Sequence, residues 1–228
     1  MRRLSQFGVS FSQNIFAAKQ QHPLEAQLWH NLSLSTGHIL PRSHLIAQVQ
    51  NLGDLDCLLR AMEPEVLDFI NSQREACSLT PEALALTHIL LLSRLWIYDA
   101  YEIVRTINEA NNYTPQSSWY EPYCLLTLVR VPLAKHQLPH EGKISAPVEM
   151  TTFQTELDKT LPLENFVHTL TYDPKDKLRS HIPVTAACTQ TGSLQWLCID
   201  FKERRQLWVS RRQIADLILN IKGSNSNI

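Results

Sequence analysis

The strongest constraint on the fold is a helical repeat of apolar residues over residues 80–112. Thr80, Pro81 and Glu82 form a typical helix start, in which the threonine caps the helix and the proline takes its first position. Small and apolar residues then recur at spacings of four and three, at Leu86, Leu90, Ser93, Ile97, Ala100, Val104 and Ile107. Because this stripe covers about seven turns, the helix is expected to face other helices along its length.

A second helix is predicted from Trp119, and prolines interrupt its far end. One face of it carries, at spacings of three and four, Tyr123, Leu126, Arg130 and Leu133. Pro132 removes one backbone hydrogen bond and is expected to bend the helix. The loop at 111–118 is short, so the two helices are expected to pack antiparallel, as in a bundle.

The flanking segments give weaker signals. A helix is predicted over 55–76, with Asp54 as its N-cap and Pro64 as a kink or a division. Residues 1–23 have little periodicity, and residues 24–52 are weakly helical, with Pro41 as a break. Together, residues 1–54 are expected to form an extension that packs on the bundle. A further short helix is expected over 151–161.

Strand-forming residues dominate the C-terminal part. Segments 182–189 and 194–201 flank a turn centred on Gly192, which is typical of a β-hairpin. Additional strand candidates are 166–172 and 206–210. Ser210 is expected to cap a closing helix. A lone hairpin is not stable in water, so this part must pack on the bundle or on a partner.

The predicted fold class is therefore mainly α. An antiparallel helical bundle is expected at 55–162, followed at 163–222 by a small antiparallel β-hairpin or sheet with a closing helix. A chain of 228 residues with 44% apolar and 19% charged residues is typical of a folded globular protein. Its net charge of −1 gives no global attraction to nucleic acid or membrane, so any RNA binding must use a local patch.

Several functional classes lack their sequence signatures. The chain has 6 glycines and neither a GxGxxG nor a P-loop motif, and we expect no cofactor. Its 5 cysteines form no CxxC pair, which favours reduced thiols. The N-terminus lacks the apolar core of a signal peptide, and no apolar run is long enough to span a bilayer. A soluble, cytoplasmic protein without a membrane partner is expected.

The most specific chemical feature is Arg130 on an apolar helix face, followed six residues later by His136. A buried guanidinium is costly unless it is paired, and histidine transfers protons near neutral pH. On a straight helix the two side chains would lie about 120° apart, but a bend at Pro132 could bring them together. One interpretation is a metal-independent site for cleaving RNA through its own 2′-hydroxyl. The other is a kinked core helix with one buried ion pair and an exposed histidine.

Residues 128–136 resemble the Arg-x(4–6)-His signature of the HEPN superfamily (higher eukaryotes and prokaryotes nucleotide-binding), and the resemblance covers roughly residues 55–160. Members are small helical bundles, and many are metal-independent endoribonucleases of toxin–antitoxin, abortive-infection and CRISPR systems. The resemblance implies that Arg130 stabilises the phosphorane and that His136 acts as the acid or base. It also implies a homodimer whose two motifs line one cleft. Where the family often has a polar residue after the arginine, this chain has Val131.

Two acids on the preceding helix, Asp99 and Glu102, are the predicted partners of Arg130, because the two helices should run antiparallel. Family members often place an acid there. The alternative is a solvated face with exposed ion pairs. His136 and His140 have a metal-ligand spacing, but Pro139 between them argues against a regular helix, so no metal site is predicted.

The basic segment 202–212 is a candidate RNA contact, with an aromatic residue, Trp208, among its positive charges. The arginines concerned are Arg204, Arg205, Arg211 and Arg212. The alternative is an amphipathic connection in which Leu207, Trp208 and Val209 enter the core while the arginines stay solvated.

Two hypotheses follow for the function. The first is a dimeric HEPN-like endoribonuclease, a hydrolase of a toxin or antiviral defence system, with RNA and a cognate antitoxin or other defence protein as partners. The second is a non-catalytic helical module that binds a nucleotide, RNA or a protein, with Val131 marking lost activity.

Overall fold

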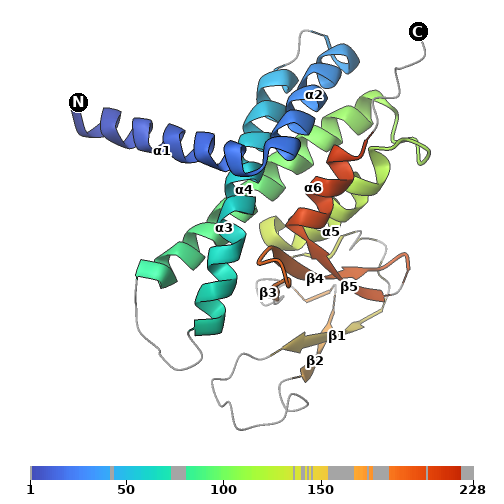
Figure 1. Ribbon diagram of the computed structural model, residues 1–228. Helices are drawn as coiled ribbons and strands as arrows, with labels where there is room; N and C mark the ends of the chain where they lie inside the picture. The colour runs from blue at the N-terminus through green and yellow to red at the C-terminus, as the bar shows by residue number, and fades with distance from the viewer. Residues whose placement is uncertain are drawn as a thin grey trace.

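The computed structural model describes residues 2–41, 44–72, 81–135, 137–139, 142, 144, 146–153, 167–173, 175–176, 185–203 and 205–221. This part of the chain is mainly helical, with small antiparallel sheets, which confirms the predicted fold class (Figure 1). The helices are α1 (Arg2–Gln21), α2 (Pro23–Ile39), α3 (Leu45–Ser72), α4 (Pro81–Ala110), α5 (Tyr120–Lys135) and α6 (Arg211–Leu219). The strands are β1 (Val148–Phe153), β2 (Val167–Tyr172), β3 (Ala186–Cys188), β4 (Leu194–Asp200) and β5 (Arg205–Ser210).

The central helix α4 follows its sequence pattern closely. The stripe residues Ser93, Ile97, Ala100, Val104 and Ile107 are all buried. The chain then reverses direction through two residues with left-handed backbone, Asn112 and Tyr113. Contacts from α4 to α5 run in opposite sequence order, from Tyr98 with Leu133 to Asn108 with Trp119. The two helices are therefore antiparallel, as predicted. The predicted cap, Thr80, lies outside the described residues.

The N-terminal helices depart from the sequence-based expectation. Helix α3 begins at Leu45, so the predicted start at residue 55 with Asp54 as N-cap is wrong. The physical reason is that Leu45, Val49 and Leu52 are buried at helical spacing and extend the same apolar stripe backwards. Pro64 lies inside α3 and does not divide it. Ahead of α3, α2 packs along it, and α1 extends from the body of the molecule (Figure 1).

The C-terminal strands form two sheets. β3, β4 and β5 make one antiparallel sheet, and Gly192, with φ of 86°, lies in the predicted hairpin turn. β2 confirms the strand expected at 166–172, but it pairs with β1 in a separate two-stranded sheet, with Met150 opposite Leu170. The prediction of a helix over 151–161 is wrong for residues 151–153, which belong to β1. Threonines in this segment favour a strand. The remaining residues of the predicted helix lie outside the described part.

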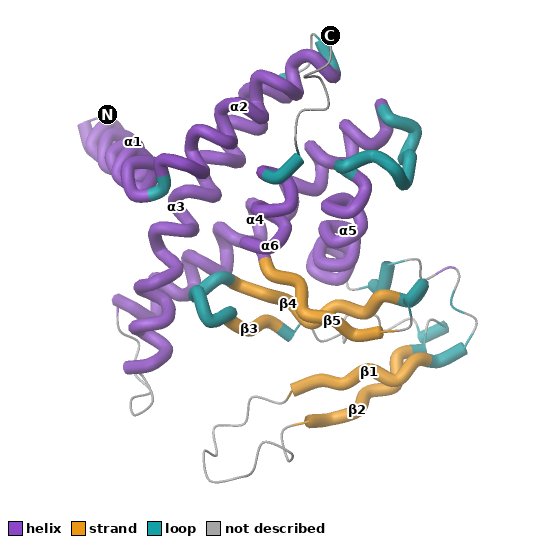
Figure 2. The backbone as a smooth tube through the Cα atoms, turned by 45° about the vertical axis from the view of Figure 1, so that its right-hand side comes forward, coloured by secondary structure: helices purple, strands orange, loops and turns teal. Residues whose placement is uncertain are grey.

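The closing helix α6 packs its apolar side into the main hydrophobic core. Ser210 caps it as predicted, because its Oγ accepts a hydrogen bond of 3.0 Å from the backbone N–H of Gln213. Ile214 and Ile218 are buried in a core that also contains Trp96 of α4 and Trp196 of β4. Figure 2 shows the three-stranded sheet between the helices and the β1–β2 pair. The C-terminal segment thus packs on the helical bundle.

Two further expectations concern thiols and membranes. Cys57, Cys124, Cys188 and Cys198 are free, and burial raises the pKa of Cys57 and Cys198 to about 12. Such thiols carry little thiolate at neutral pH and are unreactive. Across the described residues, no helix combines the length and apolar content needed to cross a bilayer.

Candidate functional site

Arg130 lies in the last two turns of α5, with 24% of its side chain exposed. Its Nη2 is 3.5 Å from Oε1 of Glu102 on α4, which is one of its two predicted partners. The guanidinium also lies 4.8 Å from the ring centroid of Tyr101, at cation–π distance. The half-exposed Glu102 holds Arg130 loosely, because solvent-accessible ion pairs contribute at most about 1 kcal/mol.

The second predicted acid, Asp99, takes no part in this contact. Its side chain is exposed, and among the described residues no ion pair joins it to Arg130. Partial desolvation by the surrounding protein raises the pKa of Asp99 above its ordinary value. Glu102 instead shares its carboxylate between Arg130 and Arg105, which also pairs with Glu109. The polar face of α4 therefore carries a chain of exposed ion pairs, and Arg130 of α5 joins this chain through Glu102.

The other half of the predicted catalytic pair, His136, lies outside the described residues, as does His140. Helix α5 continues through Pro132 as far as Lys135. Val131, directly after the arginine, is half-buried.

Four tyrosines surround this end of the bundle, a feature that the sequence analysis missed. Tyr101 stacks on Tyr123 with ring centroids 6.0 Å apart and planes at 25°. Tyr113 approaches Tyr123 at 5.3 Å, and Tyr120 lies 6.5 Å from it. Burial and the adjacent Tyr123 raise the pKa of Tyr101, so its phenol stays protonated at neutral pH. The available signal was the spacing of three between Tyr120 and Tyr123, on a helix predicted to face α4.

A pocket of about 230 Å³ opens beside these rings. One wall is formed by Tyr113, Tyr120 and Tyr123, and the other by Phe201 and Lys202 from the turn between β4 and β5. The pocket thus lies where the bundle meets the three-stranded sheet. It combines aromatic and apolar walls with one exposed lysine, Lys202, and one carboxylate, Asp200.

The arginines of the basic segment do not form one surface. Arg205 is exposed, Arg204 lies outside the described residues, and Arg211 is only 1% exposed. Arg212 is half-buried and lies 3.0 Å from Oε2 of Glu63. Arg211 is therefore inaccessible to a phosphate. The alternative, an amphipathic connection, fits the apolar residues better, since Val209 is buried and Leu207 and Trp208 are half-buried. It is wrong for Arg211, which it expected to be solvated.

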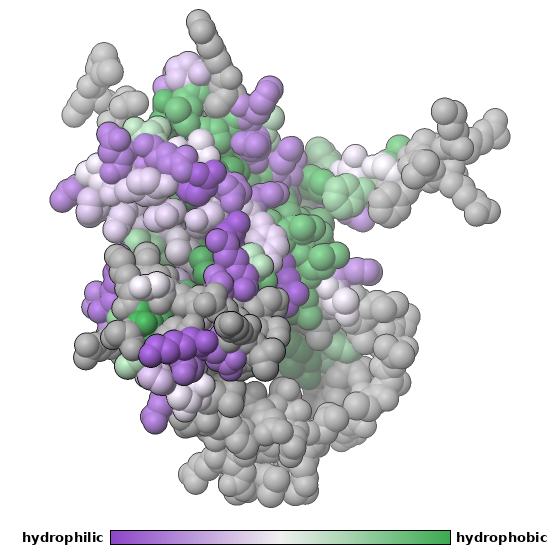
Figure 3. Space-filling model, turned by 180° about the vertical axis from the view of Figure 1, so that it is seen from behind, coloured by the Kyte–Doolittle hydropathy of each residue, from purple (hydrophilic) through white to green (hydrophobic). Residues whose placement is uncertain are grey.

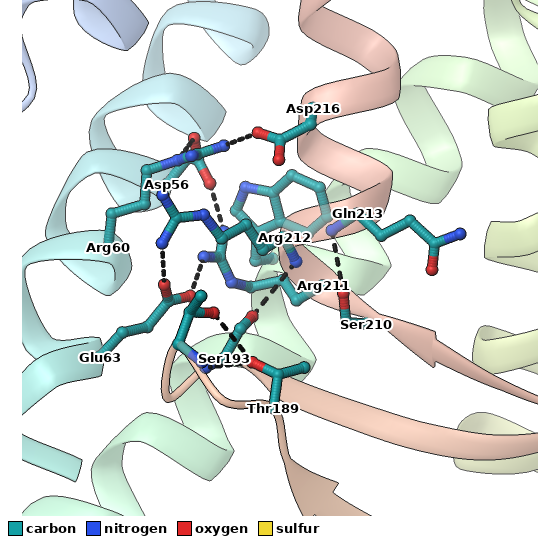
Figure 4. Close-up of polar contacts among 12 residues, drawn as sticks. Asp56, Arg60, Glu63, Thr189, Ser193, Ser210, Arg211, Arg212, Gln213 and Asp216 are labelled. Carbon is teal, nitrogen blue, oxygen red and sulfur yellow. Dashed lines mark hydrogen bonds and ion pairs between the residues drawn. The ribbon is translucent and has the colours of Figure 1, made fainter. Parts of the chain in front are cut away.

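Arg211 belongs to a buried ionic network between α3 and α6 (Figure 4). It donates to Asp56 and, at 2.5 Å, to Glu63. Arg60 donates to Asp56 at 2.8 Å and to Asp216 at 2.5 Å. The four innermost members, Asp56, Arg60, Glu63 and Arg211, are at most 2% exposed. Every one of these four is paired, so the network joins two elements rather than presenting a binding site.

The electrostatics of the network agree with this structural role. Burial acts to raise the pKa of Asp56, but Arg211, Arg60 and a 2.8 Å hydrogen bond from Trp29 outweigh it and keep that pKa below its ordinary value. For Arg60, the carboxylates of Asp56 and Asp216 outweigh burial and raise the pKa. The sequence signal was the i, i+4, i+7 spacing of Asp56, Arg60 and Glu63, which places three charges on one face of α3.

No metal centre accompanies these sites: the described residues contain no group of three or more His, Cys, Asp or Glu side chains positioned to hold an ion. Comparison of the chain with protein-family models, with curated proteins and with solved structures finds no match.

Proposed function

We propose that this chain is a metal-independent endoribonuclease of the HEPN type, in which RNA is cleaved by attack of its own 2′-hydroxyl. Arg130 stabilises the phosphorane, and His136 transfers the proton. The observation that supports the proposal is the state of Arg130, a partly exposed guanidinium that rests on Tyr101 and pairs with one half-exposed acid. A phosphate can replace so weak a partner as Glu102, and a guanidinium has five donors to offer it.

Glu102 supports this role because it lies next to Arg130, although the ion pair between them is weak. It orients Arg130 when no RNA is bound, and it can turn to Arg105 when phosphate takes its place. The exposed Arg205 is a further contact for the RNA backbone, whereas the paired Arg211 is excluded. We propose no role for Asp99.

A homodimer is part of the proposal, because in the family two motifs line one cleft. Exposed apolar side chains support a second copy as partner: Leu91 and Leu95 on α4 are 54% and 45% exposed, and Phe16 on α1 is 65% exposed. Figure 3 shows hydrophobic residues gathered in a band on the back of the molecule. A cytoplasmic location and an antitoxin or other defence-system protein as a further partner belong to the same proposal.

The test is RNA cleavage by the full chain in the presence of a chelator. Products with 2′,3′-cyclic phosphate and 5′-hydroxyl ends are expected. Arg130→Met and His136→Ala should each lower the rate about 100-fold or more, as loss of a group that stabilises or protonates the transition state does. Arg94→Met, which removes an exposed arginine from α4, is the matched control and should cleave normally. If the wild-type chain leaves RNA intact, or Arg94→Met and Arg130→Met lose activity equally, the proposal fails.

A second candidate is RNA or nucleotide binding without cleavage. Two observations favour it: the aromatic pocket beside Arg130, and the apolar Val131 where the family often has a polar residue. The same experiment separates the two candidates. Under this alternative the wild-type chain retains RNA in a binding assay but produces no cyclic-phosphate ends.

A further inference from the structure

We infer that the pocket lined by Tyr113, Tyr120 and Tyr123 receives one base of a single-stranded RNA, adjacent to the phosphate held by Arg130. This inference rests on the proposed RNA-directed function and names a subsite for it. Aromatic side chains stack on any base because every base has a π-face, and unpaired RNA exposes its bases for such contacts. The pocket's walls are of this kind.

The size of the pocket fits a base rather than a whole nucleotide. Its volume of about 230 Å³ lies below the roughly 300–1,000 Å³ of pockets that enclose a drug-sized ligand. A base would therefore fill it, and the sugar and phosphate would stay outside. Lys202 lies at the rim, is exposed, and has no carboxylate partner for its ammonium among the described residues. Asp200 also lines the pocket, and its carboxylate accepts the backbone N–H groups of Lys202 and Glu203 within its own turn.

The backbone at Tyr113 belongs to the turn that ends α4, where the N–H of Tyr113 donates to the carbonyl oxygen of Asn108 at 2.8 Å. Tyr113 has φ of 51°, a left-handed conformation that is unfavourable for an aromatic residue, and the preceding Asn112 shares it. This conformation holds the half-exposed ring of Tyr113 over Tyr123, and its hydroxyl donates to Glu109 at 3.1 Å. The turn between α4 and α5 thus fixes the position of the Tyr113 ring before any ligand binds.

The pocket and Arg130 lie on the same face of α5. Tyr123, Thr127 and Arg130 are spaced at i, i+4 and i+7, and both Tyr123 and Thr127 line the pocket. Arg130 is ~10 Å further along the helix axis than Tyr123. Tyr101 bridges the interval, since it stacks on Tyr123 and lies under Arg130. An RNA strand that runs along this face therefore places a base in the pocket and a nearby phosphate at Arg130.

The experiment measures the affinity of the His136→Ala chain, which is not expected to cleave, for short labelled single-stranded RNAs of A, U or C at one salt concentration. Tyr113→Asn removes the ring and suits a left-handed backbone, so the fold should not suffer. We expect the Kd to rise about 5- to 140-fold, the loss of one stacked base, while the Tm changes little. Tyr113→Phe should keep the affinity. Phe11→Leu, at an exposed aromatic residue on α1, is the matched control and should bind normally.

A second variant tests the rim. Lys202→Gln should weaken binding of all three RNAs and should lower the slope of log affinity against log salt concentration by about one. Lys175→Gln, at another exposed lysine, should change neither the affinity nor the slope. If Tyr113→Asn binds RNA as tightly as its parent, or the parent does not bind RNA, the pocket is not a base subsite. If Tyr113→Asn weakens binding but the wild-type chain does not cleave, the base subsite stands and the catalytic proposal falls.

Discussion

Arg211 and Arg130 both lie among apolar residues and both face carboxylates, yet their surroundings differ in burial and in the number of partners. Arg211 is 1% exposed and bonds to Asp56 and Glu63, which are themselves buried. Arg130 is 24% exposed and pairs at 3.5 Å with Glu102, whose side chain is 51% exposed. The comparison shows that a guanidinium on an apolar helix face is committed to the fold when its acids are buried, and stays open to a ligand when they are not.

The difference can be put on an energy scale. Removing one partner of a buried ionic network leaves an unpaired charge in the interior and costs about 3–5 kcal/mol. Removing one partner of an exposed pair costs about 0–1 kcal/mol.

The largest effect is expected for Arg211→Met. The substitution leaves Asp56 and Glu63 with one arginine partner fewer each, and the free energy of unfolding should fall by about 3–5 kcal/mol. Urea unfolding of the full chain measures it. A loss below about 1 kcal/mol would show that the interior network is no stronger than a surface pair.

Gly192→Ala should have the next largest effect. Gly192 has φ of 86°, and an added Cβ would lie 2.0 Å from the backbone oxygen of Glu63, so the hairpin turn must move away from α3. We expect a loss of about 1–3 kcal/mol or more in the free energy of unfolding. Gly8→Ala, where the added Cβ meets nothing within 4 Å, is the matched control and should not destabilise. Equal stabilities of the two variants would contradict the close approach.

The third prediction concerns acid. Because the pKa of Asp56 is lowered by folding, its contribution to stability is complete above its ordinary pKa of 3.8 and is lost as the pH falls through the lower folded value. That contribution should decline by up to about 1.4 kcal/mol per pH unit. Urea unfolding of the wild-type chain and of Asp56→Asn, from about pH 6 down to about pH 3, measures the difference in slope. Parallel curves would mean that Asp56 is not held ionised by its arginines.

The smallest effect on stability is expected for Arg130→Met. Only the pair with Glu102 and the contact with Tyr101 are lost, so the free energy of unfolding should change by no more than about 1 kcal/mol. The same variant is expected to lose RNA cleavage. If Arg130→Met unfolds as readily as Arg211→Met, then Arg130 serves the fold and the contrast between the two sites disappears.

The features that the sequence could predict depend on residues that are close together in the chain. The stripe of α4, the antiparallel α5, the hairpin turn at Gly192 and the Ser210 cap each depend on residues within one element or on its neighbour. Glu102 was one of two acids proposed for Arg130, because antiparallel packing of adjacent helices limits the choice. The sequence could not decide between Glu102 and Asp99, because they lie about one turn apart on the same side of α4.

The largest error arose where segments distant in the chain meet, and two smaller errors concern neighbouring segments. Arg211 was placed on a solvated or RNA-binding surface because its partners, Asp56 and Glu63, lie 155 and 148 residues earlier. The start of α3 was placed too late because Leu45 and Val49 were not connected with the stripe that follows them. The pairing of β2 with β1, rather than with the hairpin, is a tertiary choice that strand propensity does not encode.

The buried network also has a consequence for the order in which a newly made chain can fold. Synthesis runs from the N-terminus, so α3 is complete long before the ribosome reaches Arg211 and Asp216. Until then Asp56 and Glu63 lack a positive charge that their final environment requires, and α3 cannot be sealed into its interior. A chain that ends before α6 therefore lacks Arg211 as a partner for these acids, and we expect proteases to digest its α3 faster than that of the full chain.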